Sequence, residues 1–212
     1  LQADAGLSVA GVMDAEMAKS NEGTEFDAFM QSGLDVRLDG NNGLMHHKVI
    51  AAANIPAHII ARLGSRNKKL SFAESCSGGL LAHYFTSESG ASAVFEGSLI
   101  TYSNTLKANW LAVDDDTLEA HGAVSAEVVL QMSEGAMNVS FADYAISISG
   151  VAGPTGGSDA KPVGTVYISA RSKTSVHTER FHFEGDRNYI QEQSVLMAVK
   201  MLLNVDREMF FS

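Results

Sequence analysis

The stretch that decides the fold reads LSFAESCSGGLL and covers residues 70–81. A short apolar run leads to Glu74, then to two serines and a cysteine, and finally to the glycine pair Gly78 and Gly79. Apolar residues with helical spacing follow at once, up to Phe85. We therefore predict that a strand ends within this stretch and that a helix begins there.

A turn from strand to helix is a useful place for chemistry. The first N–H groups of a helix lack partners within the helix and carry the positive end of its dipole, so they stabilise anions and developing oxyanions. Gly78 and Gly79 let the backbone approach a ligand closely, and Ser75 and Ser77 place hydroxyls at the same turn. On this stretch alone, a capped turn without any catalytic role explains the same residues.

Composition sets the protein class. A chain of 212 residues, 45% of them hydrophobic, suits one domain plus an appendage. Its net charge of -10 argues against a nucleic-acid or membrane-surface partner, because such binding relies on basic surface. The single cysteine favours a reducing compartment and excludes an internal disulfide and a thiolate-rich metal site. We expect a cytoplasmic protein without metal or cofactor, and the sequence leaves a homo-oligomer open.

Residues 1–53 differ from the rest of the chain. They contain three basic residues against eight acidic ones and so carry half of the net charge. We expect a short α/β appendage here. His46 and Lys48 resemble the His-x-Lys signature of the phospholipase D superfamily, but Ala53 stands where the signature has an aspartate. We interpret this segment as truncated and inactive, since His and Lys without an orienting acid do not activate a nucleophile. A truncated fusion, a gene-boundary artefact and a vestigial docking strand remain alternatives.

Residues 54–212 alternate between helical and strand patterns, which predicts a three-layer α/β/α domain with a central sheet covered by helices. Asn104 is a candidate cap for a helix that has Leu106, Trp110 and Leu111 as its apolar positions and carries Lys107 near its start. A long glycine-rich loop follows the strand at 144–149, and such loops are commonly functional. The other strands are expected at 70–74, 94–102, 165–170 and 176–183, and the main helices at 55–66, from 79, after Asn104, from 126, and after 187.

Six ordered motifs give this domain a resemblance to a known family. They are AESCSGG at 73–79, TYSN at 101–104 with Lys107, HGAVS at 121–125, SGVAGP at 149–154 with Gly156 and Gly157, KPVGTV at 161–166, and GDR at 185–187. With these motifs, residues 55–203 resemble the CinA C-terminal family, whose characterised members are nicotinamide-mononucleotide deamidases. Ser77 stands where that family usually has a threonine, and it keeps the hydroxyl.

The resemblance implies hydrolysis of the carboxamide of nicotinamide mononucleotide to nicotinate mononucleotide and ammonia. By motif, Ser75 is the nucleophile, Lys107 the base that activates it, and Tyr102 a hydroxyl relay or orienting group. A lysine takes a proton only when it is neutral, so its pKa, about 10.4 in model peptides, must be lowered by burial or by nearby positive charge. Cys76 is a rival nucleophile, because thiols at helix N-termini are often reactive.

The resemblance also assigns substrate-binding groups. The backbone around Ser77, Gly78 and Gly79 is expected to hold the oxyanion. The second glycine loop is expected to lie along the ribose and phosphate, with Lys161 and Arg187 either as charge partners or as braces of the loop. The remaining residues assigned to the substrate are Asn104, Gly153, Gly156 and Gly157.

A function of another class remains open. The name of the family records a link to competence and DNA damage, so the domain is alternatively a nucleotide-binding or protein-interaction module without catalysis. The acidic charge disfavours direct DNA binding.

Overall fold

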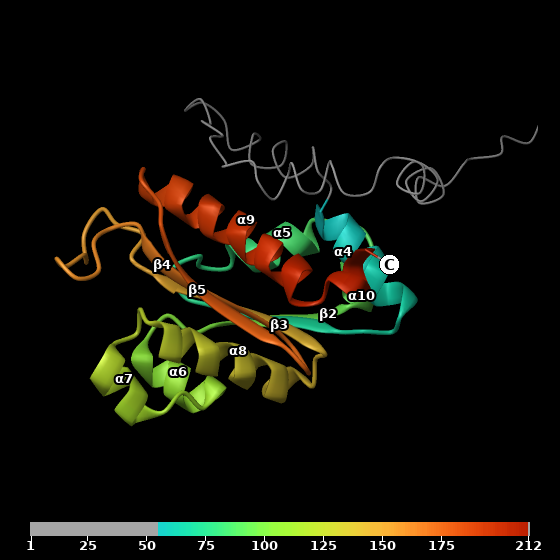
Figure 1. Ribbon diagram of the computed structural model, residues 1–212, viewed down its shortest axis with the longest axis horizontal. Coiled ribbons are helices and arrows are strands. Elements are labelled where there is room, and N and C mark those ends of the chain that lie inside the picture. Colours follow the sequence, from blue (N-terminus) through green and yellow to red (C-terminus); the bar gives the residue numbers. More distant parts are fainter. Residues whose placement is uncertain (1–54, 212) are drawn as a thin grey trace, which may run out of the picture. The chain divides into compact units, whose positions relative to one another are not determined.

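The computed structural model describes residues 55–211, and its centre is a five-stranded sheet (Figure 1). The expectations for residues 1–53, including His46 and Lys48, fall outside the described residues. The strand order across the sheet is β2-β1-β3-β4-β5. The strands are β1 (Leu70–Glu74), β2 (Phe95–Ile100), β3 (Tyr144–Gly150), β4 (Thr165–Ser172) and β5 (Val176–His182).

The sheet is mixed, and its parallel half creates the site. β1 runs parallel to both β2 and β3, whereas β4 and β5 continue the sheet antiparallel. The register places Glu74 of β1 beside Ile100 of β2 and Ile148 of β3. The carboxyl ends of three neighbouring strands therefore meet at one edge of the sheet, which is where ligands bind in open α/β sheets. All five residues of β1 are buried, the polar Ser71 and Glu74 included.

Helices cover both faces of the sheet, which confirms the three-layer prediction (Figure 1). On one face lie α6 (Asn104–Leu111), α7 (Asp115–His121) and α8 (Ala126–Ser140). The other face carries α4 (Ile55–Ser65), α5 (Leu80–Thr86), α9 (Arg187–Val205) and α10 (Arg207–Phe211). A 3-10 turn, η1, spans Ala91–Ala93.

The core under α8 joins α6 to the sheet. Leu111 of α6, Met132 of α8 and Ala73 of β1 all belong to one buried apolar cluster. The contact between the two helices is unusually close at Gly135, because a Cβ atom built there would overlap the backbone carbonyl of Leu111. Only a residue without a side chain fits at this crossing, so Gly135 sets how near α6 lies to α8.

The structure corrects three local predictions. β2 ends at Ile100, so the expected strand at 94–102 is too long at both ends. Ser103 rather than Asn104 caps α6, because its hydroxyl accepts the N–H of Leu106. Trp110, expected among the apolar positions of that helix, is 51% exposed. The 3-10 turn and α10 lack a strong periodic pattern and were not predicted.

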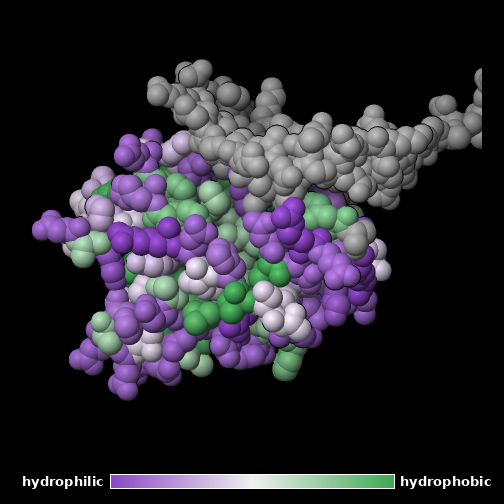
Figure 2. Space-filling view, in the orientation of Figure 1, coloured by the Kyte–Doolittle hydropathy of each residue, from purple (hydrophilic) through white to green (hydrophobic). Residues whose placement is uncertain are grey.

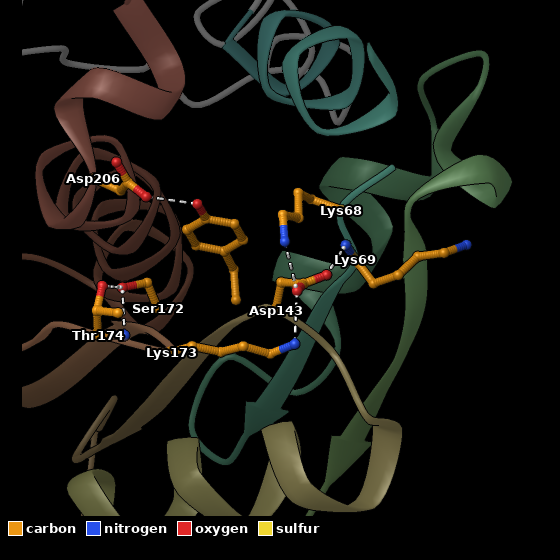
Figure 3. A network of polar contacts seen from close by, with 8 residues as sticks. Lys68, Lys69, Asp143, Ser172, Lys173, Thr174 and Asp206 are labelled. Carbon is orange, nitrogen blue, oxygen red and sulfur yellow. Dashed lines mark hydrogen bonds and ion pairs between the residues drawn. The ribbon is translucent and has the colours of Figure 1, made fainter. Parts of the chain in front are cut away.

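At the opposite end of the sheet, before β1 and β3 begin, a group of paired charges gathers around Asp143 (Figure 3). Lys68 and Lys173 converge on one carboxylate oxygen at 3.1 and 2.8 Å, and the backbone N–H of Lys69 donates to the other at 3.0 Å. We call Asp143, Lys68, Lys69 and Lys173 the Asp143 network. Burial works to raise the pKa of Asp143, but these hydrogen bonds outweigh it and hold the pKa below its usual range.

Hydrophilic residues cover most of the face seen in Figure 2, and hydrophobic ones gather near its centre. No helix among residues 55–211 is both long and apolar enough to cross a membrane.

Candidate active site

Ser75 and Lys107 meet at the carboxyl end of β1. Ser75 follows the last residue of the strand, and its N–H continues the sheet by donating to the carbonyl of Ile148. Lys107 closes the first turn of α6 and extends its side chain to the same place. Its Nζ donates to Ser75 Oγ at 3.1 Å and to the Thr101 carbonyl oxygen at 2.7 Å. Lys107 is 1% exposed and Ser75 9%, so the pair is held away from bulk water.

Burial changes the protonation of Lys107. Both acceptors of its Nζ are neutral oxygens, and the low-dielectric surroundings disfavour the ammonium form. Burial lowers the pKa of Lys107 to about 8. A substantial share of the amine is therefore neutral at a mildly alkaline pH, as a general base requires. The expected lowering of the pKa is present, and its cause is burial rather than nearby positive charge.

Cys76 is the neighbour of Ser75 in the chain, and its thiol stays protonated. Its side chain is buried, and burial raises the pKa of the thiol to about 12. A thiol with this pKa stays protonated, and the protonated form is a poor nucleophile. The carbonyl of Cys76 also accepts a hydrogen bond from Gln191 Nε2 at 2.6 Å, which connects the turn to α9. These features favour Ser75 over Cys76.

Glu74 is a buried carboxylate at the site, and the sequence motifs imply no role for it. It is the last residue of β1 and is fully buried. Its Oε2 and Oε1 accept hydrogen bonds of 2.8 to 3.1 Å from hydroxyls and from the first turn of α5. The donors are the hydroxyls of Ser77 and Ser98 and the backbone N–H groups of Gly79, Leu81 and Ala82.

The groups expected to hold an oxyanion are already engaged within the turn. The N–H of Gly78 donates to the carbonyl of Ser75, and that of Gly79 donates to Glu74. The Ser77 hydroxyl also donates to Glu74. Gly78 and Gly79 have positive φ values of 63° and 99°, so this tight turn requires glycine at both positions. Their role in this structure is to shape the turn that carries Ser75.

Tyr102 and Arg187 form a second contact near the site. The Tyr102 side chain is 60% exposed, and its hydroxyl accepts a hydrogen bond from Arg187 at 3.0 Å. The same guanidinium donates to the carbonyl of Gly153 at 2.9 Å. Arg187 is the first residue of α9, so one side chain links this helix to the end of β2 and to the second glycine loop. We call Tyr102, Arg187 and Gly153 the arginine clasp.

The rest of the second glycine loop is braced differently. Lys161 Nζ donates to the carbonyl of His121 at the end of α7, at 2.6 Å. Gly156 and Gly157 are exposed, and a Cβ atom at Gly157 would lie 2.8 Å from the backbone nitrogen of Val163. Arg187 thus holds a carbonyl at the start of the loop, whereas Lys161, near the end of the loop, holds the carbonyl of His121 at the end of α7.

Asn104 lies on the surface, unlike the buried Ser75 and Lys107 pair. It is exposed and lines a surface pocket of about 400 Å³ together with Asp115 and Glu119. Two carboxylates in the lining do not favour a phosphate there. The structure therefore brings Ser75 and Lys107 together, joins Tyr102 to Arg187, and leaves Asn104 on the surface of α6.

This chain is similar to known proteins in sequence and in fold. The family model described as the CinA C-terminal domain matches residues 52–205. The chain belongs to the CinA C-terminal domain family. A CinA-like protein of Thermotoga maritima is 46% identical over 144 residues, which cover 68% of this chain and 35% of that protein. A putative competence-damage inducible protein of Caldicellulosiruptor saccharolyticus is also 46% identical, with the same coverage. The chain thus spans about a third of the length of these curated relatives.

Solved structures of the CinA family agree with the fold. The competence/damage inducible protein CihA of Agrobacterium tumefaciens is 35% identical with a TM-score of 0.71, and the match covers 72% of this chain and 94% of that one. The competence damage-inducible protein A of Klebsiella pneumoniae is 35% identical with a TM-score of 0.68, covering 71% and 94%.

Proposed function

We propose that this CinA-family chain is a serine amidohydrolase that converts nicotinamide mononucleotide to nicotinate mononucleotide and ammonia. The observation that carries the proposal is the buried contact of 3.1 Å between Lys107 Nζ and Ser75 Oγ, with the pKa of Lys107 lowered to about 8. A serine hydroxyl is a weak nucleophile until a neighbouring base takes its proton, and a neutral lysine supplies such a base. The substrate follows from the family resemblance of the motifs.

In the first half of the proposed reaction, Ser75 becomes acylated. When Lys107 is neutral, its lone pair faces Ser75 Oγ and accepts the hydroxyl proton. The oxygen attacks the carboxamide carbon, and a negative charge forms on the carboxamide oxygen. Because the N–H groups of Gly78 and Gly79 are engaged, we assign this oxyanion to the N–H groups of Cys76 and Ser77. The C–N bond then breaks, and Lys107 returns the proton to the leaving nitrogen as ammonia departs.

In the second half, water cleaves the acyl-enzyme. Lys107 accepts a proton from the water, whose oxygen attacks the ester carbon, and the proton then returns to Ser75 Oγ as the acid leaves. We assign the entry of water and substrate to the side of Tyr102, whose side chain is 60% exposed. In this scheme Tyr102 orients the substrate through the arginine clasp, since its hydroxyl bonds to Arg187.

The same clasp supplies the proposed phosphate contact. Arg187 has a planar guanidinium at the N-terminus of α9, where the helix dipole also favours an anion. The second glycine loop begins at the clasp, so the ribose and phosphate would lie along it. Lys161 braces the far end of this loop through His121. We therefore assign the phosphate to Arg187 and a structural role to Lys161.

Ammonia release from nicotinamide mononucleotide tests the proposal. Ser75→Ala is expected to abolish release, because the acyl-enzyme has no other carrier. Cys76→Ala is the matched control: it removes the neighbouring buried side chain, whose thiol is protonated, and should leave most of the activity. Loss of activity in the Cys76 variant with retention in the Ser75 variant would make the thiol the nucleophile and the assignment wrong.

A nucleotide-binding module without catalysis is the second candidate. Relatives carry the name competence-damage inducible protein, and the arginine clasp suits a phosphate whether or not chemistry follows. Binding of nicotinamide mononucleotide by calorimetry, with no ammonia at any pH, would favour this candidate.

A further inference from the structure

The proposed mechanism does not use Glu74, although this carboxylate is fully buried directly beside the nucleophile. A buried carboxylate is costly unless its oxygens are satisfied. Glu74 meets this requirement with hydroxyls and helix N–H groups, and the positive end of the α5 dipole offsets its charge. Gly79, the residue at the N-cap of α5, has no side chain for capping, so Glu74 takes over the capping of this helix.

The side chain of Glu74 fixes the turn that carries Ser75. Its Oε2 binds the hydroxyl of Ser77 at 2.8 Å and the N–H of Gly79 at 3.0 Å. Ser75 and Cys76 lie between Glu74 and these two partners in the chain. One carboxylate at the start of the turn therefore binds the residues at its end. This closure restricts the direction of the Ser75 side chain.

The same residue also fixes the strand that leads to Lys107. Glu74 Oε1 accepts the hydroxyl of Ser98 on β2 at 2.8 Å, and the Glu74 carbonyl accepts the N–H of Thr101 at 2.9 Å. The Thr101 carbonyl in turn receives Lys107 Nζ at 2.7 Å. Glu74 thus contacts both the turn of the nucleophile and the segment that holds the base.

We propose that Glu74 is a positioning residue that sets the approach of the Ser75 hydroxyl to the Lys107 amine by fixing the 75–79 turn and the end of β2 together. This inference rests on the proposed function, because it assigns Glu74 to the same Ser75 and Lys107 pair. Glu74 itself touches no reacting atom. Its effect on rate comes from geometry, and a displacement of about 1 Å in such a pair costs up to about a hundredfold in rate.

The test measures the reactivity of Ser75 without nicotinamide mononucleotide. A fluorophosphonate is attacked at phosphorus by Ser75 Oγ, fluoride leaves, and the hydroxyl proton passes to Lys107 and then to water. Mass spectrometry of the intact chain and its peptides gives the rate and place of labelling from about pH 6 to about pH 10, a span that brackets the Lys107 midpoint. Thermal unfolding is recorded for every variant.

Glu74→Gln keeps the size of the side chain and replaces one acceptor oxygen by an amide nitrogen that cannot accept. We expect labelling at the alkaline plateau to fall by at least about tenfold. The midpoint of the pH profile should stay near that of the wild type, because the burial that sets the pKa of Lys107 is unchanged. A shifted midpoint with an unchanged plateau would instead mean that Glu74 acts on Lys107 electrostatically and would overturn the positioning role.

Asp206→Asn is the matched control. Asp206 is also a carboxylate that accepts one hydroxyl, from Tyr144 at 2.7 Å, and one helix N–H, from Met209 at 3.0 Å, but it caps α10. Both variants are expected to unfold at lower temperature, and only Glu74→Gln should lose labelling. Equal labelling in the two variants would reduce Glu74 to a helix cap and overturn the inference.

Ser98→Ala decides the question if Glu74→Gln does not fold. This change removes one donor from Oε1 and leaves the carboxylate in place, so we expect labelling to fall by about threefold, in line with the loss of one hydrogen bond. Wild-type labelling in Ser98→Ala would contradict the positioning role.

Labelling of Ser75 without ammonia release from nicotinamide mononucleotide would defeat the proposed substrate and leave the role of Glu74 standing. Absence of labelling in the wild type would overturn both.

Discussion

At one end of the sheet, Asp143 receives two lysine ammonium groups within 3.1 Å, whereas at the other end Glu74 and Lys107 bond to amides, hydroxyls and carbonyl oxygens. The Asp143 network neutralises charge by pairing, and the pKa of its carboxylate falls below the usual range. The two acceptors of Lys107 carry no negative charge, so burial lowers the pKa of Lys107 to about 8 and favours the neutral amine. Pairing thus stabilises the ionised forms, while burial without pairing prepares a group for proton transfer.

The largest expected difference appears when one lysine is removed at each end of the sheet and the two variants are compared. Lys107→Met should lower the rate of ammonia release by about a thousandfold, within the range of general-base catalysis, because Ser75 loses its proton acceptor. Lys173→Met removes an equally long side chain from the Asp143 network and should leave the rate unchanged. Steady-state rates of the two variants test the contrast, and comparable losses in both would show that the two ends do not differ in function.

The second-largest expected effect is the pH dependence of activity and stability that Lys107 causes. Activity is expected to rise about tenfold per pH unit up to about pH 8 and then to level off, because the neutral form of Lys107 is the active one. The folded pKa of Lys107 lies below the value of 10.5 that the lysine has in the unfolded chain, so the unfolded chain binds more protons between about pH 8 and 10.5. Lys107 therefore contributes stability that increases with pH across this window.

Rates of ammonia release and chemical denaturation across the pH range check both parts. A rate that is flat from pH 6 to about pH 8 would mean that Lys107 does not act as the base. Lys107→Met should also lose the alkaline increase in stability, which isolates the contribution of this one amine.

A smaller effect is expected at the arginine clasp. Arg187→Gln should raise KM for nicotinamide mononucleotide by about tenfold, because the phosphate loses a charged partner, and kcat should change little. Nicotinamide riboside, which lacks the phosphate, should be processed equally by both forms. Arg180→Gln is a suitable control, since Arg180 also donates to a carbonyl of the second glycine loop, that of Ala160. A fall in kcat alone would instead assign Arg187 to the reacting groups.

The smallest effect is expected from Asp143→Asn. The free energy of unfolding at neutral pH should fall by about 1 kcal/mol, because the lysines involved are partly exposed and such pairs contribute little. The folded pKa of Asp143 is lowered, so its stabilisation is present above the unfolded pKa of about 3.9 and is lost as pH falls through the folded value. Urea unfolding should show the two curves converging in acid, with ammonia release unchanged at neutral pH.

Much of the fold could be predicted from sequence, for physical reasons that differ by element. β1 and β3 are buried on both faces, and the apolar residues that make up most of each strand indicate strands despite the serines among them. The cap of α6 was misplaced by one residue, because Ser103 and Asn104 both suit an N-cap and sequence does not say which adopts the extended backbone. Trp110 was misassigned because its spacing fits an apolar face that this short helix does not bury.

The candidate site was predictable only in part. Ser75 and Lys107 came from the family resemblance, and their contact spans 32 positions of sequence. Arg187 and Tyr102 are 85 positions apart, so their hydrogen bond follows from tertiary structure alone. Glu74 escaped notice because a lone acid at a strand end is normally solvated, and three of its five donors are backbone N–H groups that carry no residue-specific signal.

The crossing of α6 and α8 has a consequence for how the proposed activity can change during evolution. Gly135 bears no chemical group, yet any side chain there would push against the Leu111 backbone and drive away the helix that carries Lys107. Selection for a well-placed base would therefore act on a residue 28 positions away that never meets substrate. Surveys that look for reactive side chains will pass over it, and an alanine at this position would lower activity by displacing α6 without removing any reacting group.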